Sequence, residues 1–446
     1  GEQDLPIAET FYEDGFIREK TERAVVGIEG KIPTGATLGL DFSFEKNKST
    51  SNIQTMSPRY TSKLNLSMVH PLLKDFGVGI TKTKIRLAEK GSEIARYEVK
   101  KQVMRTVGAV EQGYWDFAFA LENLELKRQS LDLAKKLLYE TDIMVRAGEL
   151  PPINLIQARA GIATREEEVI TAENDALKVE YDLKVLLDLP DNEMRLVPLD
   201  RPEKSSNIPE VNSSLDEAWE NRPDLKANRV EVDQQKIRVQ YARNQLLPRL
   251  DLIAEYGYNG LSGQPSDAVR ATDPITGEPI FAGEAVEGTV FEGKTNANDA
   301  FRKWFTGNAF DTWLVGLKFE APLSNKQAKS RYTQASLNEK RVKTELRRLE
   351  DQVDSQVRKS ILDIRSAVKR MDASSVAVEL AHEQLEAEEI RFSAGAATSY
   401  DVLTFERELT DMKIRELVAT IDYNKAWSAL RVAEGLSLEK YEIEFD

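Results

Sequence analysis

The sequence predicts a protein in which very long, coiled-coil-like helices are joined to short amphipathic strands and arranged as two tandem repeats. Three observations support this fold class. Two stretches of about 70 residues have helical periodicity and no proline. A break motif follows each of them at a constant offset. Segments that alternate with period two come directly before each long helix.

The longer helical stretch runs from Ser324 to Ala394 and contains neither glycine nor proline. As one helix it would be about 105 Å long at 1.5 Å per residue. Its apolar residues recur in steps of three and four, which places them on one helical face. This stripe consists of Val342, Leu346, Leu349, Val353, Val357, Ile361, Ile364, Val368 and Met371. So narrow a stripe favours a coiled-coil wall over a globular core, and residues 81–147 have the same character.

The two breaks indicate a tandem duplication. Residues 133–156 align with residues 380–403 without a gap, so that every matched pair lies 247 positions apart. The matches include Leu133-Ala134 with Leu380-Ala381, Ala147-Gly148 with Ala394-Gly395, and Asn154-Leu155-Ile156 with Asp401-Val402-Leu403. Pro71 and Pro322, each at the end of a strand-like segment, give a second offset of 251. Two nearly equal offsets in different kinds of structure predict a repeat.

Strand-like alternation precedes both long helices. In the segment Trp313–Glu320, one face carries Trp313, Val315, Leu317 and Phe319. Residues 249–258 and 63–68 alternate in the same way, and residues 24–32 and 36–45 form a hairpin around a Pro-Thr-Gly turn. Such segments suit a membrane barrel, with the four named residues of 313–320 facing lipid. A sheet packed on a soluble core is the alternative. The Gly-, Asp- and Pro-rich residues 259–311 are expected to form a long outer loop.

Composition excludes several function classes. The net charge is −14, which argues against a nucleic-acid-binding surface. The chain has no cysteine, so thiol chemistry and Cys-ligated zinc are excluded. No apolar run approaches the ~20 residues of a membrane helix, so any membrane crossing is expected to use strands.

Motifs that would indicate an enzyme are weak. Residues 288–295 match the phosphate-binding GxxxxGK[ST] pattern, but neither a buried strand before them nor a helix after them is predicted. The only histidines, His70 and His382, lie on different predicted elements, which disfavours a zinc site or a catalytic triad. We therefore expect no catalytic residue, no cofactor and no metal.

Taken together, the sequence resembles the TolC-like outer-membrane efflux protein family. The residues that carry the resemblance are Arg222-Pro223-Asp224-Leu225, Leu247-Pro248-Arg249-Leu250, the strand–Pro–Leu segments at Pro71 and Pro322, and the two Ala-Gly breaks. The resemblance implies a homotrimer whose subunits each give four strands to a shared barrel in outer-membrane lipid. It also implies a helical periplasmic tunnel that docks on a periplasmic adaptor protein and an inner-membrane transporter. Such a protein is a passive exit duct for efflux or type I secretion.

The same resemblance divides the chain into six segments. Residues 1–71 and 248–322 would form the membrane and extracellular parts of the two repeats, and residues 72–188 and 323–435 their tunnel hairpins. Residues 189–247 would be linker helices and 436–446 a tail. Because the counterpart of Arg249 would fall before Gly1, we expect the family's opening helices and first strand to be missing. The hairpin 24–45 would then be an addition on the outer side.

Two sets of site residues follow. The turns after the long helices are expected to be periplasmic tips that bind the adaptor, formed by Ala147, Gly148, Glu149, Ala394, Gly395 and Ala396. Asn154 and Asp401 match positions where the family often carries an acidic residue at the narrow end of the tunnel. Alternatively, Asp401 simply caps the returning helix, since Asp is favoured there.

Two other functions stay open at this point. A soluble coiled-coil scaffold would bury the apolar strand face instead of exposing it, and a nucleotide-dependent enzyme would need the pattern at 288–295 to be a real phosphate loop.

Overall fold

The computed structural model describes residues 2–6, 16–51, 56–190, 195–265, 297–306 and 310–443. The chain divides into two compact units. The first, called the sheet unit, comprises Gly1–Ala88 and Gln235–Glu339, and the second, called the helical unit, comprises Glu89–Gln234 and Lys340–Asp446. The phosphate-loop pattern at 288–295 lies outside the described residues.

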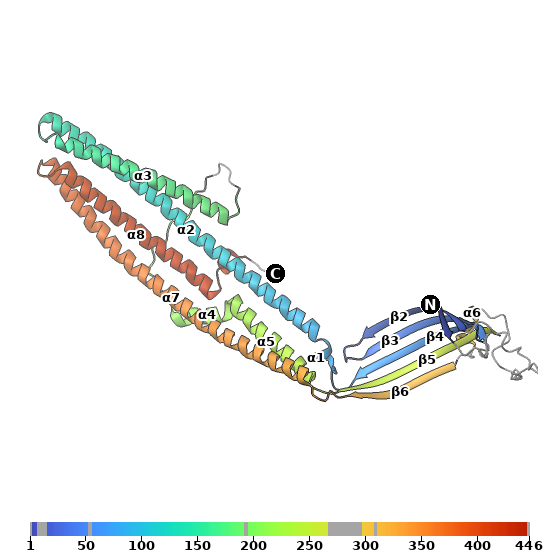
Figure 1. The fold of residues 1–446 in the computed structure, drawn as a ribbon. Helices are drawn as coiled ribbons and strands as arrows, with labels where there is room; N and C mark the ends of the chain where they lie inside the picture. The colour runs from blue at the N-terminus through green and yellow to red at the C-terminus, as the bar shows by residue number, and fades with distance from the viewer. Residues whose placement is uncertain are drawn as a thin grey trace, which may run out of the picture. The chain divides into compact units, whose positions relative to one another are not determined.

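The sheet unit is built around one antiparallel sheet whose strands follow one another in chain order (Figure 1). The described strands are β1 (Glu2–Pro6), β2 (Phe16–Lys31), β3 (Thr37–Ser49), β4 (Met56–Pro71), β5 (Arg249–Pro265) and β6 (Phe310–Glu320). The alternation predicted from the sequence is therefore confirmed as strand structure, and most strands extend beyond the predicted residues.

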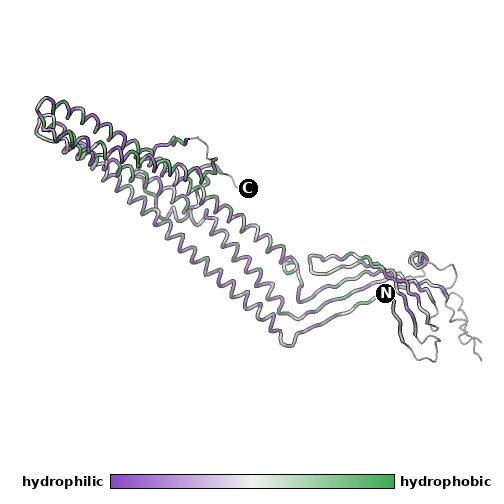
Figure 2. Tube along the Cα trace, turned by 45° about the horizontal axis from the view of Figure 1, so that its top comes forward, coloured by the Kyte–Doolittle hydropathy of each residue, from purple (hydrophilic) through white to green (hydrophobic). Residues whose placement is uncertain are grey.

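The strand register places most of the apolar strand residues on one face. Leu40 on β3 lies opposite Leu66 on β4 and Ile28 on β2, while Tyr256 on β5 lies opposite Leu66 and Trp313 on β6. Directly opposite residues share a face, so this row is apolar across five strands. On the other face, rows such as Gly27–Asp41–Asn65–Gly257–Thr312 are polar or small. Figure 2 shows the same alternation as a change of colour along the strands.

A short helix lies within the segment predicted to be a long outer loop. Helix α6 (Ala297–Phe305) packs on the apolar face of the sheet, where Phe301 stacks on Phe44 with ring centroids 5.7 Å apart. Ser62 Oγ donates a hydrogen bond of 2.8 Å to the Ala300 carbonyl, and a Cβ at Gly260 would lie 2.0 Å from that oxygen. Since β5 also continues to Pro265, the loop prediction for residues 259–311 was too long at both ends.

The position of the β2–β3 turn contradicts the expectation that the hairpin 24–45 lies on the outer side. Gly77 N donates to the Thr34 carbonyl at 3.1 Å, so the turn lies at the end of the sheet where β4 connects to the first helices. It does not lie at the outer end. The strand that corresponds to β5 is β3, because β3 pairs with β4 as β5 pairs with β6. The expected loss of that strand was wrong, because the long insert after β5 makes the repeat offset unequal along the chain.

Four long helices dominate the rest of the chain, with bounds close to those predicted. They are α2 (Thr83–Ala147), α3 (Ile153–Leu186), α7 (Lys326–Ser393) and α8 (Ser399–Glu434), and they form the hairpins α2–α3 and α7–α8. Shorter helical pieces are α1 (Val78–Thr81), α4 (Val211–Asn221), α5 (Pro223–Asn244) and the 3₁₀ turn Glu439–Tyr441. Helix α5 starts at Pro223, which suits the first turn because proline has no backbone N–H to leave unpaired.

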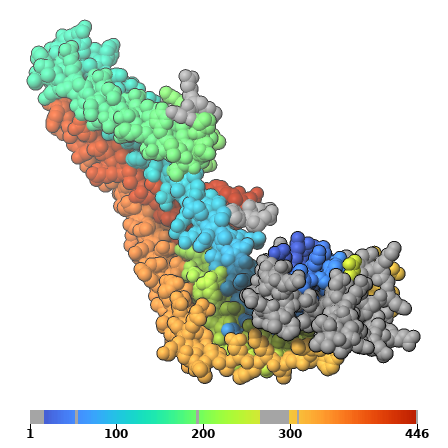
Figure 3. All heavy atoms as spheres, turned by 45° about the vertical axis from the view of Figure 1, so that its right-hand side comes forward, coloured from blue at the N-terminus to red at the C-terminus, as the bar shows by residue number. Residues whose placement is uncertain are grey.

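The predicted apolar stripe of α7 forms the core of the helical unit. Val353, Val357, Ile361 and Ile364 are almost fully buried. They pack against the facing residues Leu225 of α5 and Ala419, Tyr423, Ala426 and Leu430 of α8. Residues of α2, α7 and α8 form a second cluster near the tips, so the two hairpins are packed together. In Figure 3, α3 and α8 lie side by side on the visible face.

Among the described residues, none of the helices combines the length and hydropathy needed to cross a membrane.

Candidate functional site

The apolar strand face lies at the surface of the chain. The side chains predicted to face lipid are 65% to 74% exposed, namely Trp313, Val315, Leu317 and Phe319. The opposite face of β6 is exposed as well, apart from half-buried Gly316. A scaffold that buried this face would need a covering layer, and within the described residues α6 covers the part around Phe42, Phe44 and Ser62.

Two residues extend this face beyond what the sequence indicated. Val26 and Ile28 on β2 are 69% and 76% exposed and continue the apolar rows of β3. Their alternation was visible in the sequence, but the pairing of β2 with β3 and its place at the sheet edge were not.

The two helix tips have nearly the same backbone. Gly148 and Gly395 take left-handed φ values of 81° and 70°, which favour glycine. Gly148 N donates to the Val145 carbonyl and Gly395 N to the Phe392 carbonyl, at 3.1 and 2.9 Å. All six residues predicted to contact an adaptor, Ala147, Gly148, Glu149, Ala394, Gly395 and Ala396, are exposed. A Cβ at either glycine would meet no atom within 4 Å.

Asn154 does not lie at the surface. Its side chain is buried near the start of α3, where Nδ2 donates to the Pro151 carbonyl at 3.3 Å. Ser399 Oγ, at the start of α8, donates to the Asn154 carbonyl at 3.1 Å. Asn154 therefore joins the two hairpins in the folded chain. Of the two residues predicted to line the narrow end of the tunnel, Asp401 is the one whose side chain is partly exposed.

Asp401 is part of a capping box at the start of α8. Thr398 N and Oγ1 both donate to its Oδ2 atom, at 2.9 and 2.7 Å, and the Asp401 backbone N–H lies 3.3 Å from Thr398 Oγ1. These hydrogen bonds lower the pKa of Asp401 below its ordinary value. The capping role suggested by the sequence is thus confirmed. The side chain stays partly exposed, so a second role is sterically open.

A buried ion pair between the two hairpins was not predicted. Arg165 on α3 donates through Nη2 to Glu406 Oε2 on α8 at 3.0 Å and to the Leu403 carbonyl at 3.1 Å, and Nε donates to Ser130 Oγ on α2 at 3.0 Å. Both charged side chains are about 5% exposed. Burial raises the pKa of Glu406 to about 7, against the opposing effect of Arg165. Arg165 precedes three glutamates, and nothing in that charged run marks it for burial.

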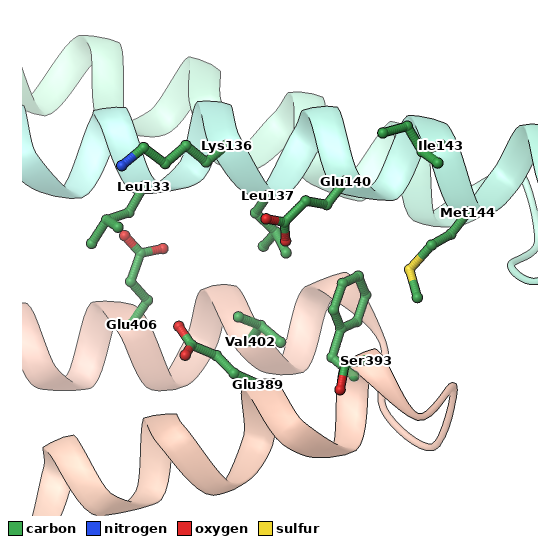
Figure 4. A pocket seen from close by; sticks show the side chains of 11 residues that line it. Leu133, Lys136, Leu137, Glu140, Ile143, Met144, Glu389, Ser393, Val402 and Glu406 are labelled. Atoms are coloured by element: carbon green, nitrogen blue, oxygen red, sulfur yellow. The ribbon is translucent and has the colours of Figure 1, made fainter.

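A cavity of about 480 Å³ lies beside this ion pair, between α2 and the α7–α8 hairpin. Figure 4 shows Leu137, Glu140 and Met144 pointing into it from α2, with Glu389 and Val402 on the opposite side. The cavity lies in the tip region and is lined by both apolar and charged side chains.

Comparisons with known proteins agree with this architecture. The sequence model of the family described as outer membrane efflux protein matches residues 214–436, half of the chain. Similar solved structures include the CmeC outer membrane channel of Campylobacter jejuni, the open state of the MtrE outer membrane channel of Neisseria gonorrhoeae and the outer membrane protein VceC of Vibrio cholerae.

Each of these three is 16% identical to the chain over 94% of its residues. The alignments cover 78%, 81% and 87% of the respective relatives, with TM-scores of 0.59, 0.60 and 0.60. At this identity the structural likeness shows a shared fold. A search of curated proteins finds no match.

Proposed function

Because the chain belongs to the outer membrane efflux protein family, we propose that three copies of it form a passive exit duct rather than an enzyme. Membership of this family makes the chain a bacterial outer-membrane protein that extends into the periplasm. The strands of the three copies would close one barrel in the membrane. The hairpins within residues 72–188 and 323–435 would line a tunnel that receives substrate from a periplasmic adaptor and an inner-membrane transporter.

The observation that carries this proposal is the continuous apolar face of the sheet. The row Ile28–Leu40–Leu66–Tyr256–Trp313 is apolar across five strands, whereas the opposite row Gly27–Asp41–Asn65–Gly257–Thr312 is polar or small, as a wall between lipid and a watery lumen requires. Open strand edges are not tolerated in lipid, so copies of the chain must close the wall.

Lipid contact of the apolar face is tested by placing a charge on one or the other face of β6. Leu317→Lys puts a cation on the apolar face and is expected to reduce membrane-inserted trimers strongly, since a lipid-facing Lys costs roughly 2–4 kcal/mol per copy. Thr312→Lys is the matched control on the opposite face and should assemble normally. Trimer yield in washed outer membranes is the measurement. Equal yields for both variants would argue against lipid contact.

Adaptor docking is proposed for the two tips. All six tip residues are exposed, and a Cβ built at either glycine meets no atom within 4 Å, so a partner can approach the backbone closely. Gly148→Trp with Gly395→Trp should abolish crosslinking to the adaptor while trimers persist. The matching pair of alanine variants carries the same backbone strain without the bulk and should keep most of the crosslinking. Undiminished crosslinking by the tryptophan variant would refute docking at the tips.

A selectivity role is proposed for Asp401. In a trimer its three copies would form a ring of negative charge that favours cations. Asp401→Asn should lower the cation selectivity of reconstituted single channels, and Asp401→Arg should lower it further. Thr398→Ala is the control, because it removes the capping partner and leaves the charge. If the three channels with Asp401, Asn or Arg had equal selectivity, only the capping role would remain.

A further inference from the structure

Strand β2 occupies the free edge of β3. Its residues Glu19–Lys31 pair with Thr37–Ser49 in a regular antiparallel register. On the other side of β2, the described part of the chain contributes the five-residue β1, which pairs with the start of β2. Among the described strands, β2 and β6 are thus the long strands at the two edges. Because the strands alternate in direction along the chain, β2 and β6 run the same way.

Strand β2 resembles β6 in sequence. Val26-Gly27-Ile28 is followed by Pro33 at the same spacing as Val315-Gly316-Leu317 is followed by Pro322. In both strands the residues flanking the glycine lie on the apolar face of the sheet.

The shared glycine has a steric reason on β2. A Cβ at Gly27 would lie 2.1 Å from Asp41 Oδ1 on β3, so a side chain there would have to displace that carboxylate. Strand β6 carries Gly316 at the matching position, although no atom lies within 4 Å of a Cβ built there in the single chain. Strand β6 is therefore suited to the edge of β3 that β2 now covers.

Copies of this sheet can close an antiparallel barrel only if β2 leaves the edge of β3. With β2 in place, β6 of one copy would meet β2 of the next in parallel, unlike any pair in the sheet. With β2 displaced, the edges would be β3 and β6, which run in opposite directions and can pair as all the other strands do. Three copies would then give twelve antiparallel strands, an even number as in bacterial outer-membrane barrels.

We propose that β2 is an internal substitute for β6 of a neighbouring copy. It covers the edge of β3 in the unassembled chain and is displaced when the trimer forms, so that Leu317 of one copy takes the place of Ile28 opposite Leu40 of the next. An exposed strand edge pairs readily with other chains, and with β2 in place the edge of β3 is reserved until β6 of a neighbouring copy displaces β2. This inference rests on the trimer of the proposed function.

The strand tilt supports this register. Within one copy, Leu40, Leu66, Tyr256 and Trp313 lie opposite one another in successive strands. If Leu317 lies opposite Leu40 of the next copy, then Trp313 lies opposite Phe44 of that copy. One subunit thus advances the register by four residues over four strands. At ~3.3 Å per residue and ~4.8 Å between strands, the tilt is about 35°. Membrane barrels have tilts of about 35–45°.

The test uses disulfides, and the chain has no cysteine of its own to interfere. Ile28→Cys with Leu40→Cys probes β2 on β3 within one copy. Leu317→Cys with Leu40→Cys probes β6 on β3 between copies. Leu40→Cys with Leu66→Cys joins β3 to β4 in either arrangement and serves as the control. Each pair is introduced into the full chain, oxidised in purified trimers and in newly made monomers, and separated on denaturing gels.

In trimers we expect the Leu317–Leu40 pair to give covalent dimers and trimers and the Ile28–Leu40 pair to stay reduced. In monomers the Ile28–Leu40 pair should close within one chain. Closing it before assembly should lower trimer yield at least tenfold, with recovery on reduction. The proposal is overturned if trimers contain the Ile28–Leu40 disulfide, or if they form the control disulfide without the Leu317–Leu40 one. If the wild-type chain formed no trimers, the proposed function itself would fail.

Discussion

The two helix tips start alike and continue differently. Up to the glycine the two tips have similar sequences, φ values and hydrogen bonds. The helices that follow them differ in how their N-termini are capped. The start of α3 has no side-chain cap, and Asn154 near it is held by Ser399 of the other repeat. The start of α8 caps itself through Thr398 and Asp401. The first tip therefore depends on the second for its stability, whereas the second is locally complete.

Arg165 should matter most, because it ties α3 to α8 just behind the first tip. Arg165→Met leaves Glu406 buried without its guanidinium partner, so we expect a loss of about 3–5 kcal/mol in the free energy of unfolding. Exposed Arg370, paired with Asp422 between α7 and α8, is the control, and Arg370→Met should cost less than about 1 kcal/mol. Chemical unfolding of the purified protein measures both. Equal losses would remove the argument that the first tip depends on buried contacts.

Glu406 should make this dependence sensitive to pH. Its pKa in the folded chain, about 7, lies above the ordinary value of 4.5, so the folded state binds more protons between those values. The free energy of unfolding should fall as pH rises from about 4.5 to about 7, by roughly 1–3 kcal/mol per copy.

In Glu406→Gln this component of the pH dependence should vanish, because glutamine does not titrate. Thermal unfolding at pH 5 and pH 8 gives the comparison. A variant with the same pH dependence as the wild type would show that Glu406 is not the titrating group.

The glycines test what the tips share. Gly148→Ala and Gly395→Ala each force an L-residue into the left-handed region, at a cost of about 1–2 kcal/mol. Since a Cβ meets no neighbour at either site, the two variants should be destabilised equally. Urea unfolding midpoints report the effect. A clearly larger loss at one tip would mean that the tips already differ at the glycine.

Thr398→Ala should have the smallest effect and should be confined to the second tip. Loss of the capping hydrogen bond costs about 1 kcal/mol and should speed amide hydrogen exchange in the first turn of α8. Pro151 holds the matching place in the first repeat, where no side chain caps α3, so Pro151→Ala should leave exchange at the start of α3 nearly unchanged. Faster exchange in both variants would contradict the difference between the tips.

The sequence by itself determined the features that depend on local periodicity. The lengths of α2 and α7, the breaks at Gly148 and Gly395 and the alternation of β6 could be read from it, because a helix or strand repeats its pattern along the chain. The family resemblance rested on the same local signals and their order.

Only the tertiary structure decided which residues are covered and by what. Arg165 and Asn154 are buried because α8 of the other repeat packs over them. The residues next to them in the sequence do not indicate that burial. The place of β2 at the edge of β3, the pairing of β3 with β4 as the counterpart of β5 with β6, and the packing of α6 on the sheet were decided in the same way. Burial and strand order depend on residues far apart in the chain, which a local pattern does not encode.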